Sequence, residues 1–277
     1  MSGAEDWEEG KRGCPRTFFY ISSGMARDDK NKDALIISVK NPITDDDRPP
    51  VFRVFTDEQM LELRTAFVED TLCTCAQLDG VDLKVSVAPK ERVPMIERAI
   101  ANLQKRHPRQ AAISSLERRL EILVQEVAPL GERIRDAVEH ELAAGYHRVL
   151  VIGGYNPTIT DTLLKSALKE MKKHSVILGP TIRGSFYLIG VDANHPGLFD
   201  GIPVGTDEAY AAIINRLQAA GLVWKELDLW YDISHQEDIE FIVRDINQFR
   251  LTGNEYSARA TEEVLTQYLE PGKDQPA

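Results

Sequence analysis

The stretch RVLVIGGYNPTITDTLLKSAL, residues 148–168, limits the fold more than any other part of the chain. It begins with the apolar run VLVI and turns at two glycines. From Thr160 it continues as a helical pattern, with apolar residues three and four positions apart. A strand without polar alternation must be covered on both faces, as a parallel strand is between layers of helices. This stretch therefore predicts an α/β protein.

The same alternation of strand and helix patterns continues through most of the chain. Thr56 and Gln59 form a capping box at one helix start, and Gly145 and Gly221 close two helical patterns. Asp207 is expected to cap the helix that follows it. Strands are expected at 34–40, 81–89, 148–152, 175–180, 185–191 and 222–233, and helices at 56–72, 130–144, 160–173, 207–220, 236–250 and 257–269. We therefore expect a three-layer sandwich with a mostly parallel central sheet.

Three segments fit this pattern less well. Residues 1–32 are a charged extension whose apolar patch, FFYI, is expected to dock on the domain. Residues 41–55, with three prolines and three successive aspartates, are expected to form a loop. A helical insertion is expected at about 90–127, although LEILVQEV at its end fits a strand equally well. The predicted organisation is thus an extension at 1–32, a main domain at 33–251, and a C-terminal helix and tail at 252–277.

Composition restricts the class of partner. The formal net charge of -11 argues against a nonspecific nucleic-acid binder, which needs clustered Lys and Arg. No apolar run reaches the roughly 20 residues that cross a bilayer, and the acidic N-terminus does not resemble a signal peptide, so a cytoplasmic location is the default expectation. Cys73 and Cys75 are expected to be buried, reduced thiols.

Ligands of such sheets bind at the carboxyl ends of the strands, but the chain has neither a G-x-G-x-x-G nor a P-loop motif. The segments GYHRVLVIGGYNPTITDTLLKSAL, HSVILGPTIRGSFYLIGV and HPGLFDGIPVGTD resemble a bacterial family of glycosyltransferase-like proteins with the GT-A, or nucleotide-diphospho-sugar transferase, fold. One branch of that family is associated with arsenosugar biosynthesis. The resemblance also includes FVEDTL at 67–72, LGERI at 130–134 and YDISHQEDI at 231–239, and it covers roughly residues 34–250.

Several acidic positions of the family's motifs are replaced here. Where the family has G-S-D-S-P, with the aspartate that holds a divalent metal in GT-A enzymes, this chain has GGYNP and Tyr155. Ile182 and Arg183 replace the two acids of E-D-G-G-Y-Y-L-I-G, and Ser234 replaces the second aspartate of D-I-D-T-P-E-D-L. The family's basic loop ending in K-T-R-L is replaced by ITDDDRPPVF, which would repel a diphosphate.

The resemblance implies Mg²⁺ or Mn²⁺ as a cofactor, but Tyr155 and Ser234 cannot supply the carboxylates that such a metal needs. We therefore assign no metal ligands from the sequence. The candidate catalytic residues are Arg183 as leaving-group stabiliser, Asp207 as base and Asp232 as ligand-orienting acid; the candidate cofactor-binding residues are Lys40, Arg133, Gly153, Tyr155, Asn156 and Thr206.

Each of these candidates also has a purely structural explanation. Arg183 can be a solvated turn residue, Tyr155 can serve packing alone, Asn156 suits a turn, and a charge such as Arg133 suits a helix start. Thr206 and Asp207 match the family's T-D pair and can also cap the following helix. His235 beside Asp232 is explained most simply by the polarity of a helix start.

Three functions remain open. The first is a divergent transferase that works without a conventional metal. The second is a catalytically inactive relative that binds a nucleotide or a sugar, or that regulates an active enzyme. The third is a structural or assembly protein that makes its contacts through the N-terminal extension and the 90–127 segment. The expected partners are accordingly a nucleotide sugar, a protein or a second copy of this chain.

Overall fold

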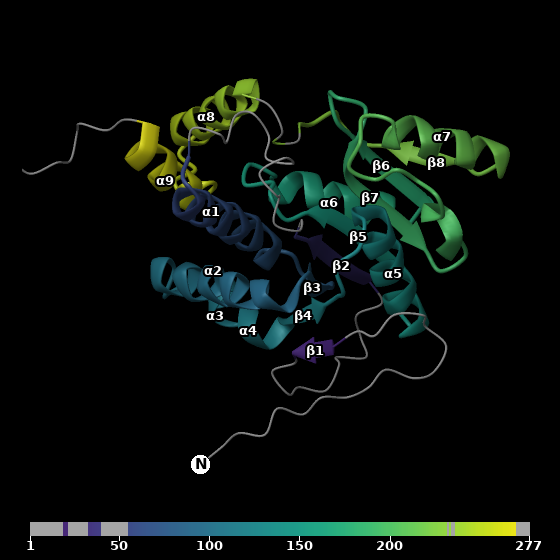
Figure 1. Ribbon diagram of the computed structural model, residues 1–277, viewed down its shortest axis with the longest axis horizontal. Coiled ribbons are helices and arrows are strands. Elements are labelled where there is room, and N and C mark those ends of the chain that lie inside the picture. The colour runs from purple at the N-terminus through teal and green to yellow at the C-terminus, as the bar shows by residue number, and fades with distance from the viewer. Residues whose placement is uncertain (1–18, 22–32, 40–54, 232, 234–235, 270–277) are drawn as a thin grey trace, which may run out of the picture.

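Eight strands form one mixed sheet in the part of the chain that the computed structural model describes, residues 19–21, 33–39, 55–231, 233 and 236–269 (Figure 1). The order across the sheet is β1-β4-β3-β2-β5-β7-β6-β8. The strands are β1 Phe19–Ile21, β2 Asp33–Ser38, β3 Asp82–Val87, β4 Leu120–Val124, β5 Arg148–Gly153, β6 Val176–Pro180, β7 Phe186–Asp192 and β8 Trp224–Glu226. The strands β1 and β7 run opposite to the strands beside them. The other strands run in one direction, so the sheet is mostly parallel.

Helices cover both faces of this sheet, as the apolar strands require. The longer ones are α1 Asp57–Ala76, α2 Val93–Arg106, α5 Leu130–Ala143, α6 Asp161–Glu170, α7 Ala209–Ala219, α8 Gln236–Leu251 and α9 Arg259–Leu269. The helices α1, α2 and α6 pack on one face, and α5 and α7 pack on the other (Figure 1). The α/β fold expected from the sequence is confirmed. In the described residues, no helix has the length and apolarity that crossing a membrane requires.

Local sequence signals locate several of these elements. Thr56 and Gln59 form the expected capping box of α1, and Thr160 accepts the backbone N–H of Leu163 at the start of α6. Gly145 and Gly221 have positive φ after α5 and α7, as expected for left-handed C-terminal residues. Part of the FFYI patch forms β1, which pairs with β4. Cys73 and Cys75 are buried, free thiols, and burial raises the pKa of both.

Two expectations about strands need correction. The helical segment expected at 90–127 contains α2, the single turns η3 Lys90–Arg92, α3 Ala111–Ser114 and α4 Leu116–Arg119, and then β4, so the strand alternative for LEILVQEV is right. The long strand expected at 222–233 is reduced to β8 and an isolated bridge at Trp230. The neighbouring strand β6 ends at Pro180, which cannot donate to a ladder, and its register shifts there.

Asp207 does not cap the helix after it. The helix α7 begins at Ala209, with Glu208 as its N-cap residue and no side-chain cap. Asp207 lies one residue earlier, with its carbonyl against Gly184, where a Cβ atom would approach that oxygen to 2.3 Å. Thr206 lies two residues before the N-cap residue, and its Oγ1 accepts the N–H of Glu208 at 3.3 Å.

The C-terminal helix α9 is docked on α1 by Asp70, an acid of the FVEDTL motif. Asp70 is 4% exposed, and its two carboxylate oxygens accept the N–H groups of Ala260 at 3.1 Å and of Thr261 at 2.7 Å. Burial raises the pKa of this carboxyl to about 7, although the hydrogen bonds from Thr261 and Ala260 oppose the shift. Because the pKa is higher in the folded state, the contribution of Asp70 to stability falls as the pH rises from about 4 to about 7.

We expect Asp70→Asn to lower the free energy of unfolding by about 1–3 kcal/mol, because the amide can accept only one of the two N–H groups. The loss should be larger at pH 5 than at pH 8. The stabilising contribution of Asp70 is greater at the lower pH, and the asparagine variant has no carboxyl that titrates. Urea unfolding at both pH values measures this difference, with the exposed Asp79→Asn as control. Equal losses at the two pH values would contradict the raised pKa.

Candidate functional site

A cleft opens at the carboxyl ends of β2 and β5, beside the start of β7. It encloses about 750 Å³, counting the part that is open to solvent. Its lining comes from the ends of these strands, the loop after β5, the first turns of α5 and the loop before α7: Ser38, Leu130, Ile134, Val151, Ile152, Gly153, Gly154, Tyr155, Asn156, Ser185, Phe186, Tyr187, Val204, Gly205, Tyr231 and Ile233. This is the edge at which ligands of parallel sheets bind.

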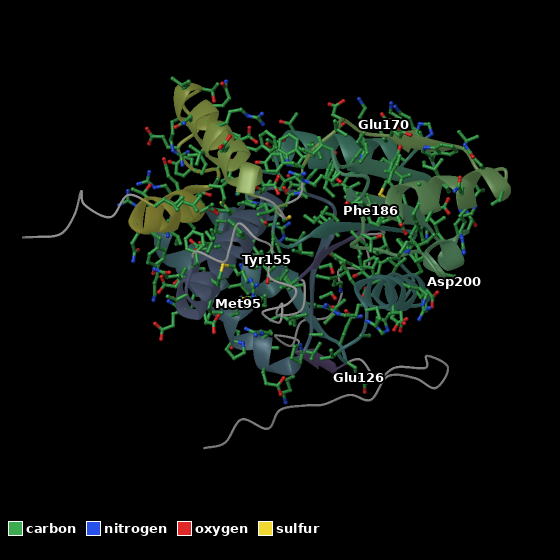
Figure 2. The ribbon with its side chains drawn as sticks, turned by 45° about the horizontal axis from the view of Figure 1, so that its top comes forward. Met95, Glu126, Tyr155, Glu170, Phe186 and Asp200 are labelled. Carbon is green, nitrogen blue, oxygen red and sulfur yellow. The ribbon has the colours of Figure 1, made fainter. Side chains whose placement is uncertain are left out.

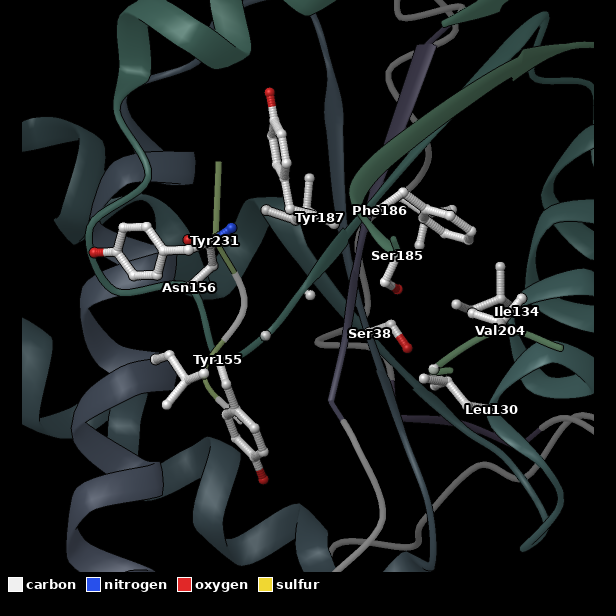
Figure 3. Close-up of a pocket in the computed structure, with 16 residues that line it drawn as sticks. Ser38, Leu130, Ile134, Tyr155, Asn156, Ser185, Phe186, Tyr187, Val204 and Tyr231 are labelled. Carbon is white, nitrogen blue, oxygen red and sulfur yellow. The ribbon is translucent and has the colours of Figure 1, made fainter. Parts of the chain in front are cut away.

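Two serine hydroxyls lie in an otherwise apolar part of this cleft. Ser38 ends β2 and is 4% exposed, and Ser185, 9% exposed, directly precedes β7. In Figure 3 both hydroxyls face the side of the cleft formed by Leu130, Ile134 and Val204. The Ser38 hydroxyl has no hydrogen-bond partner among the described residues.

The loop after β5 is fixed against β2 and α1. Gly154 donates its N–H to the Ser38 carbonyl at 2.8 Å, and a Cβ atom on Gly154 would lie 2.8 Å from Val39. Thr71, from the FVEDTL motif, accepts the N–H of Asn156 at 3.3 Å. The GGYNP turn is therefore held by close backbone approach and by α1, which sets the direction of the Tyr155 side chain.

Tyr155 extends away from the two serines, toward the α1 side of the sheet (Figure 3). Its ring packs against Phe67, with the ring centres 6.2 Å apart, and Figure 2 places it near the middle of the molecule. Burial raises the pKa of its phenol, while the positive charges of Arg64, Arg92 and Arg133 act in the opposite direction. Tyr155 is thus a neutral, partly buried ring in a region of positive charge.

The three arginines reach this region from different elements. Arg64 lies on α1, Arg92 ends the turn after β3, and Arg133 lies in the first turns of α5. Arg133 is only 1% exposed and donates from Nη2 to the carbonyl of Val39, just beyond β2, at 3.1 Å. Burial lowers its pKa to about 10, so its guanidinium still carries a charge near neutral pH. The positive charges of all three arginines therefore act on Tyr155, at the carboxyl end of β5.

These residues do not fit a divalent metal. A metal that bridges a diphosphate needs ionised carboxylates, whereas Tyr155 is a protonated phenol among cations. The described residues contain no group of three or more His, Cys, Asp or Glu side chains arranged to hold a metal ion. Guanidinium groups can supply the same positive charge to an anion through hydrogen bonds.

The other candidates from the sequence are placed as follows. Gly153, Tyr155 and Asn156 line the cleft, and a Cβ atom on Gly153 would meet nothing within 4 Å. Arg183, on the turn between β6 and β7, pairs with the fully buried Asp238 of α8 at 3.1 Å. Thr206 and Asp207 are exposed and lie beside that turn, but not in the cleft lining. Lys40, Asp232, Ser234, His235 and the aspartates 45–47 lie outside the described residues.

Sequence reasoning missed Ser38, Ser185, Arg64 and Arg92. Ser38 is the only polar residue in the run ALIISV, a signal that was available. Ser185 stands at the second glycine of the family's E-D-G-G-Y-Y-L-I-G motif. Arg64 and Arg92 gave no such signal, because helical periodicity does not show which charged side chains lie near a strand end.

The chain has an α/β fold like that of nucleotide-diphospho-sugar transferase-like structures, with a cleft at the carboxyl ends of its strands. The structure matches a protein from Desulfovibrio desulfuricans G20 described as a "putative nucleotide-diphospho-sugar transferase", with a TM-score of 0.64 and 24% identity over 86% of this chain and 98% of that chain. It also matches 4-diphosphocytidyl-2C-methyl-D-erythritol synthase from Anaerococcus prevotii DSM 20548, with 13% identity over 79% of this chain and 97% of that chain. That match has a TM-score of 0.49.

Residues 71–206 match the model of the family described as "Uncharacterized protein conserved in bacteria (DUF2064)". This match includes the GGYNP turn, the IRGSFYLIG segment and the first turns of α5. Comparison with curated proteins gives no match. The fold that the resemblance implies is therefore confirmed.

Proposed function

We propose that this chain binds a diphosphate-bearing ligand, of the nucleotide-sugar class, without a divalent metal. The observation that carries the proposal is the buried Arg133, whose Nη2 lies 3.1 Å from the Val39 carbonyl just beyond β2; the charges of Arg64 and Arg92 act with it on Tyr155. Tyr155 stands where the family's motif has its metal-binding aspartate. In this chain a neutral ring near three arginines replaces an aspartate that binds a metal ion. The arginines can attract the diphosphate in place of the metal.

The proposal concerns binding rather than transfer. A transfer reaction also needs a base for the acceptor and a group that stabilises the leaving diphosphate. Asp207 does not line the cleft, and Arg183 is engaged with Asp238. These placements favour a binding or regulatory relative over an active transferase.

Calorimetry with inorganic pyrophosphate and a panel of nucleotide sugars, in EDTA, tests the proposal. We expect binding without metal, and we expect Arg92→Gln and Arg64→Gln each to weaken the affinity by about tenfold or more, since each removes a charge-assisted hydrogen bond. The matched control is Arg98→Gln, an exposed arginine on α2.

Two results would overturn this function. The first is no binding of any of these ligands at millimolar concentration. The second is binding that requires Mn²⁺ and disappears in Asp232→Ala, because a metal site would then have been rebuilt from other residues.

A further inference from the structure

We infer that the α5 side of the cleft, formed by Ser38, Ser185, Leu130, Ile134 and Val204, is a subsite for the uncharged ring of the ligand. The ring is of the class that has apolar faces and a hydrogen-bonding edge, as nucleobases and sugars have. This inference rests on the proposed function, in which the arginines hold the anionic part of the same ligand.

The Ser38 hydroxyl is the first observation behind this subsite. It is buried at the end of β2, lines the cleft and has no hydrogen-bond partner in the described part of the chain. A buried hydroxyl without a partner is unfavourable, so an alanine at this position would suit the ligand-free fold better. A serine there is explained if a ligand atom completes its hydrogen bond.

Ser185 and the start of α5 add further polar groups at the same place. Ser185 lines the cleft from the β7 side, and its hydroxyl faces the same way as that of Ser38 (Figure 3). The first residue of α5, Leu130, also lines the cleft, and Pro129 at the N-cap contributes no side-chain cap. The partial positive charge of this helix end attracts electronegative atoms such as carbonyl or hydroxyl oxygens.

The walls of the subsite favour an uncharged ring. Leu130, Ile134 and Val204 form the side that the hydroxyls face, and the Phe186 ring also lines the cleft. None of the described residues that line the cleft is charged. A phosphate placed here would meet no charged side chain in the described lining, whereas a ring can bury its faces and direct its polar edge to the two serines.

Tyr155 divides the two parts of the site. Its ring extends toward α1, which carries Arg64, and the serines lie on the other side of the strand ends (Figure 3). Arg133, on α5, also acts on the ring by its charge. A ligand with an anion joined to a neutral ring matches this separation. An inorganic anion alone would use only the arginine side.

Calorimetry in EDTA on the full chain tests the subsite with two pairs of probes. Nucleoside diphosphates of the common bases are compared with pyrophosphate, and hexose 1-phosphates are compared with phosphate. We expect one ring-bearing class to bind at least about tenfold tighter than its plain anion, which identifies the ring as a base or a sugar. In Ser38→Ala and in Ser185→Ala the affinity that the ring adds over the plain anion should fall by about tenfold, because the hydrogen bond to the ring is lost.

The melting temperature of the ligand-free protein distinguishes this role from a structural one. Ser38→Ala should melt at the same temperature as the parent or higher, and the exposed Ser166→Ala on α6 is the control for both readouts. If pyrophosphate binds but a ring adds no affinity, or if both serine variants keep the full gain, the subsite is wrong and the proposed function stands. If no anion binds to the unsubstituted chain, the proposed function fails and this inference fails with it.

Discussion

Replacing Lys84 with methionine is expected to lower the free energy of unfolding by about 3–5 kcal/mol, because it leaves a buried carboxylate without its cation. Lys84 lies on β3 and is 1% exposed. Its ammonium group pairs with Glu121 of β4, lies 3.8 Å from the fully buried Glu141 of α5, and sits 5.2 Å from the centre of the Tyr146 ring. Methionine keeps the aliphatic bulk and removes only the charge.

Urea unfolding of three variants separates charge from packing in this cluster. Lys84→Met and Glu141→Gln alone should each be destabilising, and the double variant should recover a large part of the loss, since of the three charges only that of the partly exposed Glu121 then remains. Lowering the pH should reduce the penalty of Lys84→Met, because a buried acid without a counter-ion takes up a proton more readily. A penalty below about 1 kcal/mol at neutral pH would mean that the cluster is hydrated rather than buried.

Much of the fold could be predicted from the sequence because its signals are local. The apolar run of β5, the capping box at Thr56 and the glycines after α5 and α7 each act within a few residues. The strand β4 was ambiguous, since a short apolar run fits a buried helix as well as a buried strand. The strand expected at 222–233 was too long because its end depends on Pro180 in the neighbouring strand.

Residues of the site could be predicted only where they belong to a recognisable sequence motif. Gly153, Tyr155 and Asn156 follow a recognisable strand, and the structure places all three in the cleft. Arg64 and Arg92 are separated from Tyr155 by 91 and 63 positions in the sequence, so only the packing of α1 and the turn after β3 brings their charges to it. The sequence shows the FVEDTL motif, but only the structure shows what its residues contact. Thr71 accepts the N–H of Asn156 in the GGYNP turn, and Asp70 accepts the N–H of Thr261 in α9.

Restoring the family's acid tests whether the arginines have replaced the metal. We expect Tyr155→Asp to show no binding of Mn²⁺ at millimolar concentration and to weaken pyrophosphate binding by about a hundredfold. The new carboxylate would pair with the arginines that are proposed to hold the anion, and a like charge at about 4 Å costs on the order of 4 kcal/mol near a protein surface before salt and solvent reduce it. A metal ion would in turn meet the positive charges of Arg64, Arg92 and Arg133.

The neutral variant Tyr155→Asn is the matched control for this substitution. Both variants lose the ring that packs on Phe67, with an expected destabilisation of about 3–5 kcal/mol, so the difference between them isolates the charge. Calorimetry with Mn²⁺ and with pyrophosphate should therefore separate Asp from Asn in anion affinity, and thermal unfolding measures the loss of the ring that the two variants share. Stoichiometric Mn²⁺ binding by Tyr155→Asp with undiminished pyrophosphate affinity would show that the site lacks only one acid, and that the arginines have not taken over the role of the metal.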